Sequence, residues 1–453
     1  FGSSHFGSSQ RISISFEVLL PHCFLCLAMV GYAAAAGLAV AALLHKTAED
    51  NKWRKAILAG LVTWPILAYL RKMSRRVLGF EREKGYIEEW AEQYEEDAIE
   101  PDLRIVDAHH HLWDWMTQPR LPPGLMPKPI AFLVLRMTPK TINRLFADDK
   151  VTTNTMGARI PVCAPYMGPE LVRDIKGNGR GHNVVGTIFI ECGWHAEVKE
   201  ECMKPAGEVD AMMEVNRQHP GIVQGIIAHA DLTLGKEVEP LLKLYSANPM
   251  VKGIRDALAC PRDDSISADA TPDKGYDTKF REGFALLQKY NLTYDSWHFH
   301  VDLDSFTDLA KSFPQQTMIC DHMAFPLGIG KYDKEATFPE WKTKMTELAK
   351  YNNVYVKIGG FGMRFPGFGF DERPKPPTSD ELAAAWAPYV KHTIDAFGVD
   401  RCIMESNFPM DKISCSYTVL FNALKKIVKD YSQEDKQKLF ELNALRVYQL
   451  TLT

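Results

Sequence analysis

The chain has 453 residues, of which 46% are hydrophobic and 24% are charged, and this composition excludes a disordered protein. The 53 Lys and Arg residues nearly balance the 57 Asp and Glu residues, which argues against nucleic acid as a partner. Most of the nine cysteines lie in or beside apolar runs, where free thiols pack as small hydrophobes, so we expect a reducing compartment.

The N-terminal region differs from the rest of the chain. Residues 1–16 carry the near-repeat FGSSHFGSSQ and are predicted to be disordered or a non-native leader, with Met29 as an alternative start. Residues 18–44 contain no Asp, Glu, Lys or Arg, and a span of about 20 apolar residues crosses a bilayer. We therefore predict hydrophobic helices over 17–76 that anchor the protein to a membrane. A start at Met29 would shorten the first run and weaken this prediction.

A second apolar run, 56–70, is followed by RKMSRR. The positive-inside rule then predicts a membrane-associated protein whose following domain faces the cytosol. A targeting peptide or a buried helical hairpin are the alternatives.

The charged segment 77–103 is predicted to be a linker helix, and after it short apolar runs alternate with helical stretches. Most of these runs are rich in Val and Ile, as parallel strands buried on both faces should be. Eight such runs predict an α/β protein with a (β/α)8 TIM barrel over 104–453, in preference to a doubly wound sheet. The runs are 104–109, 184–193, 221–232, 250–258, 291–300, 317–322, 354–360 and 401–407.

The first run ends in three consecutive histidines. Because side chains alternate along a strand, Asp107, His109 and His111 are predicted to share one face, while His110 points to the helical layer. Two imidazoles two residues apart can hold one divalent ion, although buried histidines are more often structural.

Other predicted strands also end in chemically capable side chains. The fifth run ends in WHFH, where the same alternation puts His298 and His300 on one face, and the sixth ends in Asp321 and His322. Several strand ends that deliver such groups to one rim indicate an active site at the carboxyl end of the barrel.

These motifs together resemble the amidohydrolase superfamily, in its branch of lactonases and decarboxylase-like enzymes. The resemblance covers about 104–449 and rests on VDAHHHLWD, HNVVGTIFIECG, VKGIRD, ICDHMAFPLG, VYVKIGGFGM, ELAAAWAPYV and RCIMESNFPMDK. It implies that His109, His111 and His300 are metal ligands and that His322 handles protons.

The resemblance also leads us to expect an aspartate on strand eight, where this chain has Asn407. An amide is neutral and cannot act as a general base. Glu405, Asp411 and Glu191 are the candidates for the missing charge, and we favour Glu191; a carboxylate that merely orients a histidine is the alternative. A divalent metal, with zinc preferred on the nitrogen-rich ligands, and a metal-free site both remain open.

The predicted reaction is hydrolysis of a lactone, ester or amide in a small organic acid. Arg255 would hold a carboxylate or steady an oxyanion, unless it is only a structural ion-pair partner, and His298 and Glu405 would contact the substrate. Non-oxidative decarboxylation is one alternative, and a membrane-tethered binding or scaffold protein without catalysis is another. The expected partners are a small-molecule substrate, a membrane through 17–76 and a second copy of the chain.

Overall fold

The computed structural model describes residues 86–114, 117–119, 151, 154–155, 157, 165–267 and 269–452. The predictions for 1–16 and 17–76 lie outside the described residues and stay predictions. Within the described part, the segment 77–103 contains the helix α3 (Tyr86–Ala91). No helix in these ranges combines the length and the apolar character needed to span a bilayer.

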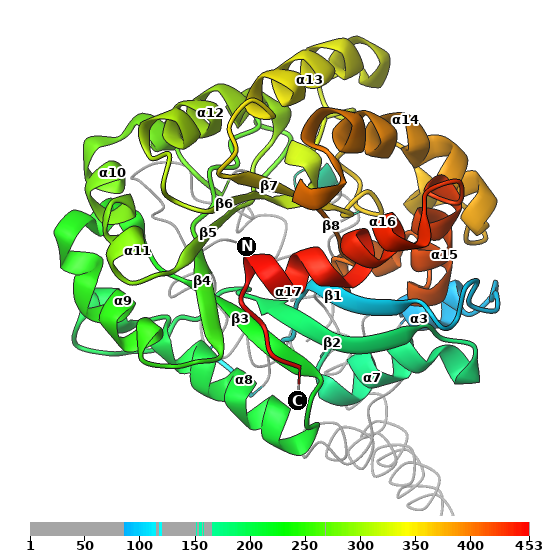
Figure 1. Ribbon diagram of the computed structural model, residues 1–453, viewed down its shortest axis with the longest axis horizontal. Helices are drawn as coiled ribbons and strands as arrows, with labels where there is room; N and C mark the ends of the chain where they lie inside the picture. Colours follow the sequence, from blue (N-terminus) through cyan, green and yellow to red (C-terminus); the bar gives the residue numbers. More distant parts are fainter. Residues whose placement is uncertain are drawn as a thin grey trace, which may run out of the picture. The chain divides into compact units, whose positions relative to one another are not determined.

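Eight parallel strands form one sheet in sequential order, and helices surround it (Figure 1). The ring is closed just after β8, because Asn407 N–H donates to His109 O at 2.8 Å and His111 N–H donates to Phe408 O at 2.8 Å. Each of the eight predicted runs overlaps one strand, so the predicted TIM barrel is confirmed. The strands are β1 (Arg104–His110), β2 (Asn183–Ile190), β3 (Val223–His229), β4 (Val251–Arg255), β5 (Thr293–Ser296), β6 (Met318–Cys320), β7 (Val354–Ile358) and β8 (Cys402–Met404).

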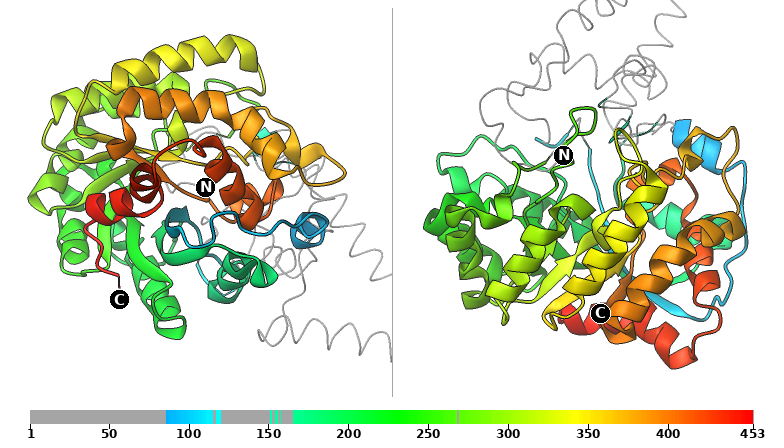
Figure 2. Two further views of the ribbon diagram at one scale, coloured as in Figure 1. Left: turned by 45° about the vertical axis from the view of Figure 1, so that its right-hand side comes forward. Right: turned by 90° about the horizontal axis from the view of Figure 1, so that it is seen from above.

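The outer layer consists of helices that follow the strands, and Figure 2 shows α13 and α14 side by side on the outside of the ring. Helix α14 illustrates how the sequence sets a boundary: Thr378 Oγ1 accepts from Glu381 N–H, and the Glu381 carboxylate accepts from Thr378 N–H at 2.8 Å. The helices are α7 (Gly168–Lys176), α8 (Ala206–Gln218), α9 (Glu239–Ser246), α10 (Thr278–Phe284), α11 (Leu286–Lys289), α12 (Leu303–Ser312), α13 (Lys334–Leu348), α14 (Ser379–Phe397), α15 (Tyr417–Ile427), α16 (Gln433–Gln437) and α17 (Asn443–Val447).

The interior of the barrel is layered along its axis. Ile227, Ile319 and Ile403 belong to a buried apolar cluster inside the ring, and the next inward position of β6 and β8 carries a carboxylate, Asp321 or Glu405. Strand alternation thus places an apolar layer beneath a charged layer at the carboxyl end.

The C-terminal segment closes the opposite end of the barrel, where α17 lies across the strands (Figure 1). Val447, Tyr448 and Leu450 join the inner apolar cluster. A pocket of about 270 Å³ lies beside them, lined by the residues at the starts of β4 and β5.

A β-bulge in β1 changes which residues face inward. Asp107 pairs with Thr187 and His110 with Phe189, so β1 holds one extra residue between these pairs. The prediction that Asp107 shares a face with His109 and His111 is therefore wrong. Its carboxylate instead accepts from Tyr417 Oη–H on α15 at 2.9 Å.

Candidate active site

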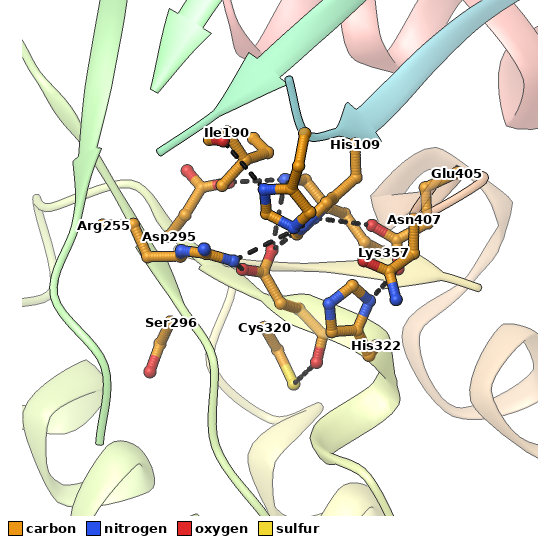
Figure 3. A network of polar contacts seen from close by, with 12 residues as sticks. His109, Ile190, Arg255, Asp295, Ser296, Cys320, His322, Lys357, Glu405 and Asn407 are labelled. Atoms are coloured by element: carbon orange, nitrogen blue, oxygen red, sulfur yellow. Dashed lines mark hydrogen bonds and ion pairs between the residues drawn. The ribbon is translucent and has the colours of Figure 1, made fainter. Parts of the chain in front are cut away.

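Two histidines from β1 converge at the carboxyl end of the barrel. His109 Nε2 and His111 Nε2 lie 3.2 Å apart, and both side chains are buried (Figure 3 labels His109). His111 Nδ1 lies 2.9 Å from Ile190 O, and a carbonyl can only accept, so the His111 proton is on Nδ1. The lone pair on His111 Nε2 therefore points at the neighbouring imidazole. His110 lies on the other side of the strand, with Nε2 2.8 Å from Thr187 Oγ1.

Glu405 connects His109 to His322. Its Oε2 lies 3.0 Å from His109 Nδ1, and its Oε1 lies 2.5 Å from His322 Nδ1 (Figure 3). Burial raises the pKa of the Glu405 carboxyl well above its usual value, and burial lowers the pKa of His322 to about 3. Both effects favour a neutral imidazole in hydrogen-bond contact with a carboxyl group.

The backbone that carries His322 is strained. His322, Met323 and Ala324 all have positive φ, at 55°, 52° and 53°, in the left-handed region that residues other than glycine avoid. Gly360 faces the ring: a Cβ at that position would lie 2.6 Å from His322 Cγ. The Gly360 backbone therefore packs against the imidazole with no room for a larger side chain.

An aromatic wall flanks His322. The Phe325 ring lies 4.8 Å from the His322 ring, and Trp297 lies 5.1 Å from Phe325 and 5.3 Å from Phe365, measured between centroids. Phe365 comes from the long connection after β7. This wall gives one side of the site an apolar surface.

Two charged residues of this layer, Lys357 and Asp295, were not singled out from the sequence. Lys357 on β7 is completely buried, and its Nζ lies 2.7 Å from Asp295 Oδ2 and 3.1 Å from Asp321 Oδ1 (Figure 3). Burial raises the pKa of Asp295 to about 6, whereas the pKa of Asp321 is lowered because Lys357 and its other neighbours outweigh burial. The signal in the sequence was a lysine or aspartate inside an otherwise apolar run, as in VYVKIGG.

Arg255 and Glu191 form a buried ion pair between β4 and the end of β2. Arg255 Nε–H donates to Glu191 Oε1 at 2.8 Å, and Arg255 Nη2–H donates to Glu191 O at 2.6 Å. Burial works to raise the pKa of Glu191, but the guanidinium and its other neighbours hold it below the usual value. Glu191 is thus neutralised by Arg255, while Arg255 Nη1 lies 3.4 Å from His109 Nε2.

Asn407 makes a side-chain hydrogen bond to Asp411 and has a left-handed backbone conformation. Its Nδ2–H donates to Asp411 Oδ1 at 2.8 Å, and its φ is 54°, a conformation that asparagine tolerates better than most residues. Glu405, two residues before Asn407, contacts His109, and Asp321 Oδ1 lies 3.7 Å from the same imidazole, whereas Glu191 pairs with Arg255.

His298 and His300 lie apart from this cluster. His300 Nδ1 accepts from Leu327 N–H at 3.2 Å, and the His298 ring stacks on Phe306 at 4.5 Å. The expectation that both face the site assumed that strand alternation continues to residue 300, but β5 ends at Ser296. The structure therefore does not bring His300 to the other two predicted ligands.

Comparison with known proteins identifies the family of this chain. A family model described as amidohydrolase matches residues 106–450. The chain belongs to the amidohydrolase family. The resemblance recognised from the sequence motifs is confirmed.

Two curated proteins and one solved structure are among those similar to this chain. An uncharacterised protein of Sinorhizobium fredii is 28% identical over 77% of this chain and 99% of its own length. An L-fucono-1,5-lactonase of Burkholderia ambifaria is 28% identical over 37% of this chain and 49% of its own length. A crystal structure of an amidohydrolase from Burkholderia multivorans, solved with bound zinc, covers 77% of this chain and 99% of its own with a TM-score of 0.54 at 16% identity, which supports the fold.

The donor set of this amidohydrolase fits a divalent cation. Among the described residues, His109, His322 and Glu405 are the one group of three such side chains whose ligand atoms all lie within 4.8 Å of one another. His111 is not part of this group but adds a second nitrogen, 3.2 Å from His109 Nε2. Glu405 Oε2 and both carboxylate oxygens of Asp321 are buried without a hydrogen-bond partner, although ion-pair contacts surround them. In this layer four carboxyl groups face two permanent cations, which leaves two carboxyl groups for a divalent ion. The four are Glu191, Asp295, Asp321 and Glu405, and the two cations are Arg255 and Lys357.

Proposed function

We propose that this amidohydrolase hydrolyses a lactone, ester or amide bond in a small organic acid, with a divalent cation, preferably zinc, at the His109 and His111 pair. The observation that carries the proposal is the 3.2 Å separation of the two Nε2 atoms, with the His111 lone pair directed between them. The similarity to an L-fucono-1,5-lactonase favours a lactone among the three bond types.

The cation would be held by His109 and His111, and Glu405 is the nearest carboxylate to this pair. When bound, such an ion supplies Lewis-acid polarisation of a carbonyl group. Glu405 Oε2, 3.0 Å from His109 Nδ1, orients the imidazole so that Nε2 faces the pair.

His322 handles the proton in the proposed reaction. Its Nδ1 is engaged by Glu405 Oε1, and the low pKa keeps the imidazole neutral, so that its other ring nitrogen can exchange a proton with a reacting group. The rigid seat against Gly360 holds the ring in the orientation this transfer needs.

Arg255 binds the acid group or the developing oxyanion. Two of its nitrogens are used by Glu191, and Nη1, 3.4 Å from His109 Nε2, faces the pair of histidines. A guanidinium in this place stabilises negative charge next to the reacting bond. Phe325 and the rest of the aromatic wall exclude water on the His322 side.

A substrate panel tests the proposal. The full chain is assayed with lactones, esters, amides and carboxylic acids, with added Zn²⁺ and after chelation, beside His322→Ala and the control His392→Ala, whose imidazole lies outside the barrel against Lys342 O. We expect hydrolysis that is lost on chelation and in His322→Ala but kept in His392→Ala. Release of CO2 from a carboxylic acid without hydrolysis would establish the decarboxylase alternative, and ligand binding without turnover would establish the binding-protein alternative.

A further inference from the structure

Lys357 lies at the centre of a chain of contacts that runs from His109 to the C-terminal segment. Its Nζ lies 3.1 Å from Asp321 Oδ1 and 3.4 Å from His109 Nδ1, on the side of that imidazole opposite the Nε2 pair. It also donates to Asp295 Oδ2 at 2.7 Å. One ammonium group therefore contacts two carboxylates, Asp321 and Asp295, and the His109 imidazole (Figure 3).

Asp295 passes this contact to the C-terminal segment. Its Oδ2 accepts from Tyr448 Oη–H at 2.7 Å, and the Lys357 ammonium lies 5.6 Å from the centre of the Tyr448 ring. A lysine side chain has several rotatable bonds, so its ammonium stays in one place only when such partners hold it. Tyr448 borders the pocket at the amino-terminal end of the barrel.

Lys357 is the closest counter-charge of Asp321. Both of its oxygens lack a hydrogen-bond partner, and its cationic contacts are Lys357 at 3.1 Å and Arg255 at 3.8 Å. Movement of Lys357 would leave a buried carboxylate next to His109 without its closest counter-charge.

We propose that Lys357, Asp295 and Tyr448 form a positioning relay that fixes Asp321 and His109 from the amino-terminal end of the barrel and so sets the cation affinity of the site. The inference rests on the cation site of the proposed function but not on the bond that is hydrolysed. Lys357, Asp295 and Tyr448 act through Asp321 and His109; none of them touches substrate.

The relay is tested with Tyr448→Phe in the full chain, because this variant removes one hydroxyl and keeps the ring. Titration with Co²⁺ and Zn²⁺ by calorimetry measures affinity, and the visible spectrum of bound Co²⁺ reports the ligand geometry. Changes behind a metal ligand cost about 10–100-fold in affinity or activity, so we expect about a 10-fold loss of affinity and a shifted spectrum. On a substrate from the panel, kcat should fall by a similar factor while KM stays within about two-fold.

Two further comparisons separate positioning from general loss of stability. Tyr245→Phe is the matched control: its buried Oη–H donates to His229 O at 2.9 Å, outside the relay, and its removal should leave Co²⁺ affinity unchanged. Lys357→Arg keeps the charge but changes the geometry of the contacts with Asp321 and His109, so it should also lower Co²⁺ affinity and shift the spectrum.

The outcomes decide the proposal. A Tyr448→Phe protein with wild-type Co²⁺ affinity and spectrum overturns the relay, as does an equal loss in Tyr245→Phe or a wild-type protein that binds neither ion. If the affinity and spectrum change as expected while no lactone, ester or amide is cleaved, the relay stands and the proposed hydrolysis fails.

Discussion

Gly360 offers a sharp test of how tightly His322 must be held. Its φ is 77°, and an added Cβ would lie 2.6 Å from both Cγ and Nδ1 of His322 and 2.8 Å from its Cβ. An ordinary carbon contact is about 3.5–4.0 Å, so Gly360→Ala must displace the ring by about 1 Å. A misplacement of about 1 Å costs on the order of 100-fold in rate. We therefore expect kcat/KM to fall about 100-fold, which corresponds to a loss of about 2.7 kcal/mol of transition-state stabilisation.

Gly369→Ala is the matched control for this variant. Gly369 has a similar φ of 67°, but no heavy atom lies within 4 Å of its Cβ position. Both variants should lose about 1 kcal/mol of unfolding free energy to backbone strain. Steady-state hydrolysis and urea unfolding of both proteins provide the comparison. If Gly360→Ala keeps activity at the level of Gly369→Ala, the rigid seat of His322 is not what the reaction requires.

Three other changes have defined outcomes. His111→Ala removes one nitrogen donor and should lower zinc affinity at least about 100-fold, measured by calorimetry, and an unchanged affinity would exclude it as a ligand. Arg255→Met leaves the Glu191 carboxylate buried without its partner and should cost about 3–5 kcal/mol in urea unfolding, with recovery when Glu191→Gln is added; absence of recovery would refute the pairing. Burial lowers the pKa of His182 to about 3, and its Nδ1 lies 3.0 Å from Lys425 Nζ, so protonation is disfavoured in the folded state. The unfolded state therefore binds a proton below about pH 6.5 that the folded state does not, and the free energy of unfolding falls by about 2 kcal/mol between pH 7 and pH 5. In His182→Gln the free energy of unfolding should fall less over the same pH range.

The barrel could be predicted from the sequence because each strand lies in a short apolar run and several of these runs end in a reactive side chain. Ile319 and Ile403 illustrate the pattern, since the inward position two residues later in each case carries the carboxylate of the site. Glu405, one of the sequence candidates for the missing charge, is one of these two inward carboxylates.

Alternation failed wherever the strand was irregular or had ended. The bulge in β1 turned Asp107 outward, and the end of β5 at Ser296 released His298 and His300 from the pattern. Neither event leaves a mark in the residue types, because bulges and strand ends depend on the pairing of neighbouring strands.

Partners on distant strands were also beyond the reach of the sequence. Glu191 was favoured to replace the missing aspartate charge, but Arg255 on β4 neutralises it. Lys357 was read as part of an apolar run, and its role follows only once β5, β6 and β7 are brought together around it.

The left-handed turn at His322, Met323 and Ala324 sets stability against activity at this point of the molecule. Three such residues in sequence cost the fold about 1–3 kcal/mol each, and the rest of the barrel supplies that energy. Selection for thermal stability alone would therefore favour glycine at Met323 or Ala324, at the expense of the one conformation that seats His322 beside Glu405. Substitutions that raise the thermal stability of this protein are therefore better placed in the outer helices, whose backbone does not carry the strain of the His322 turn.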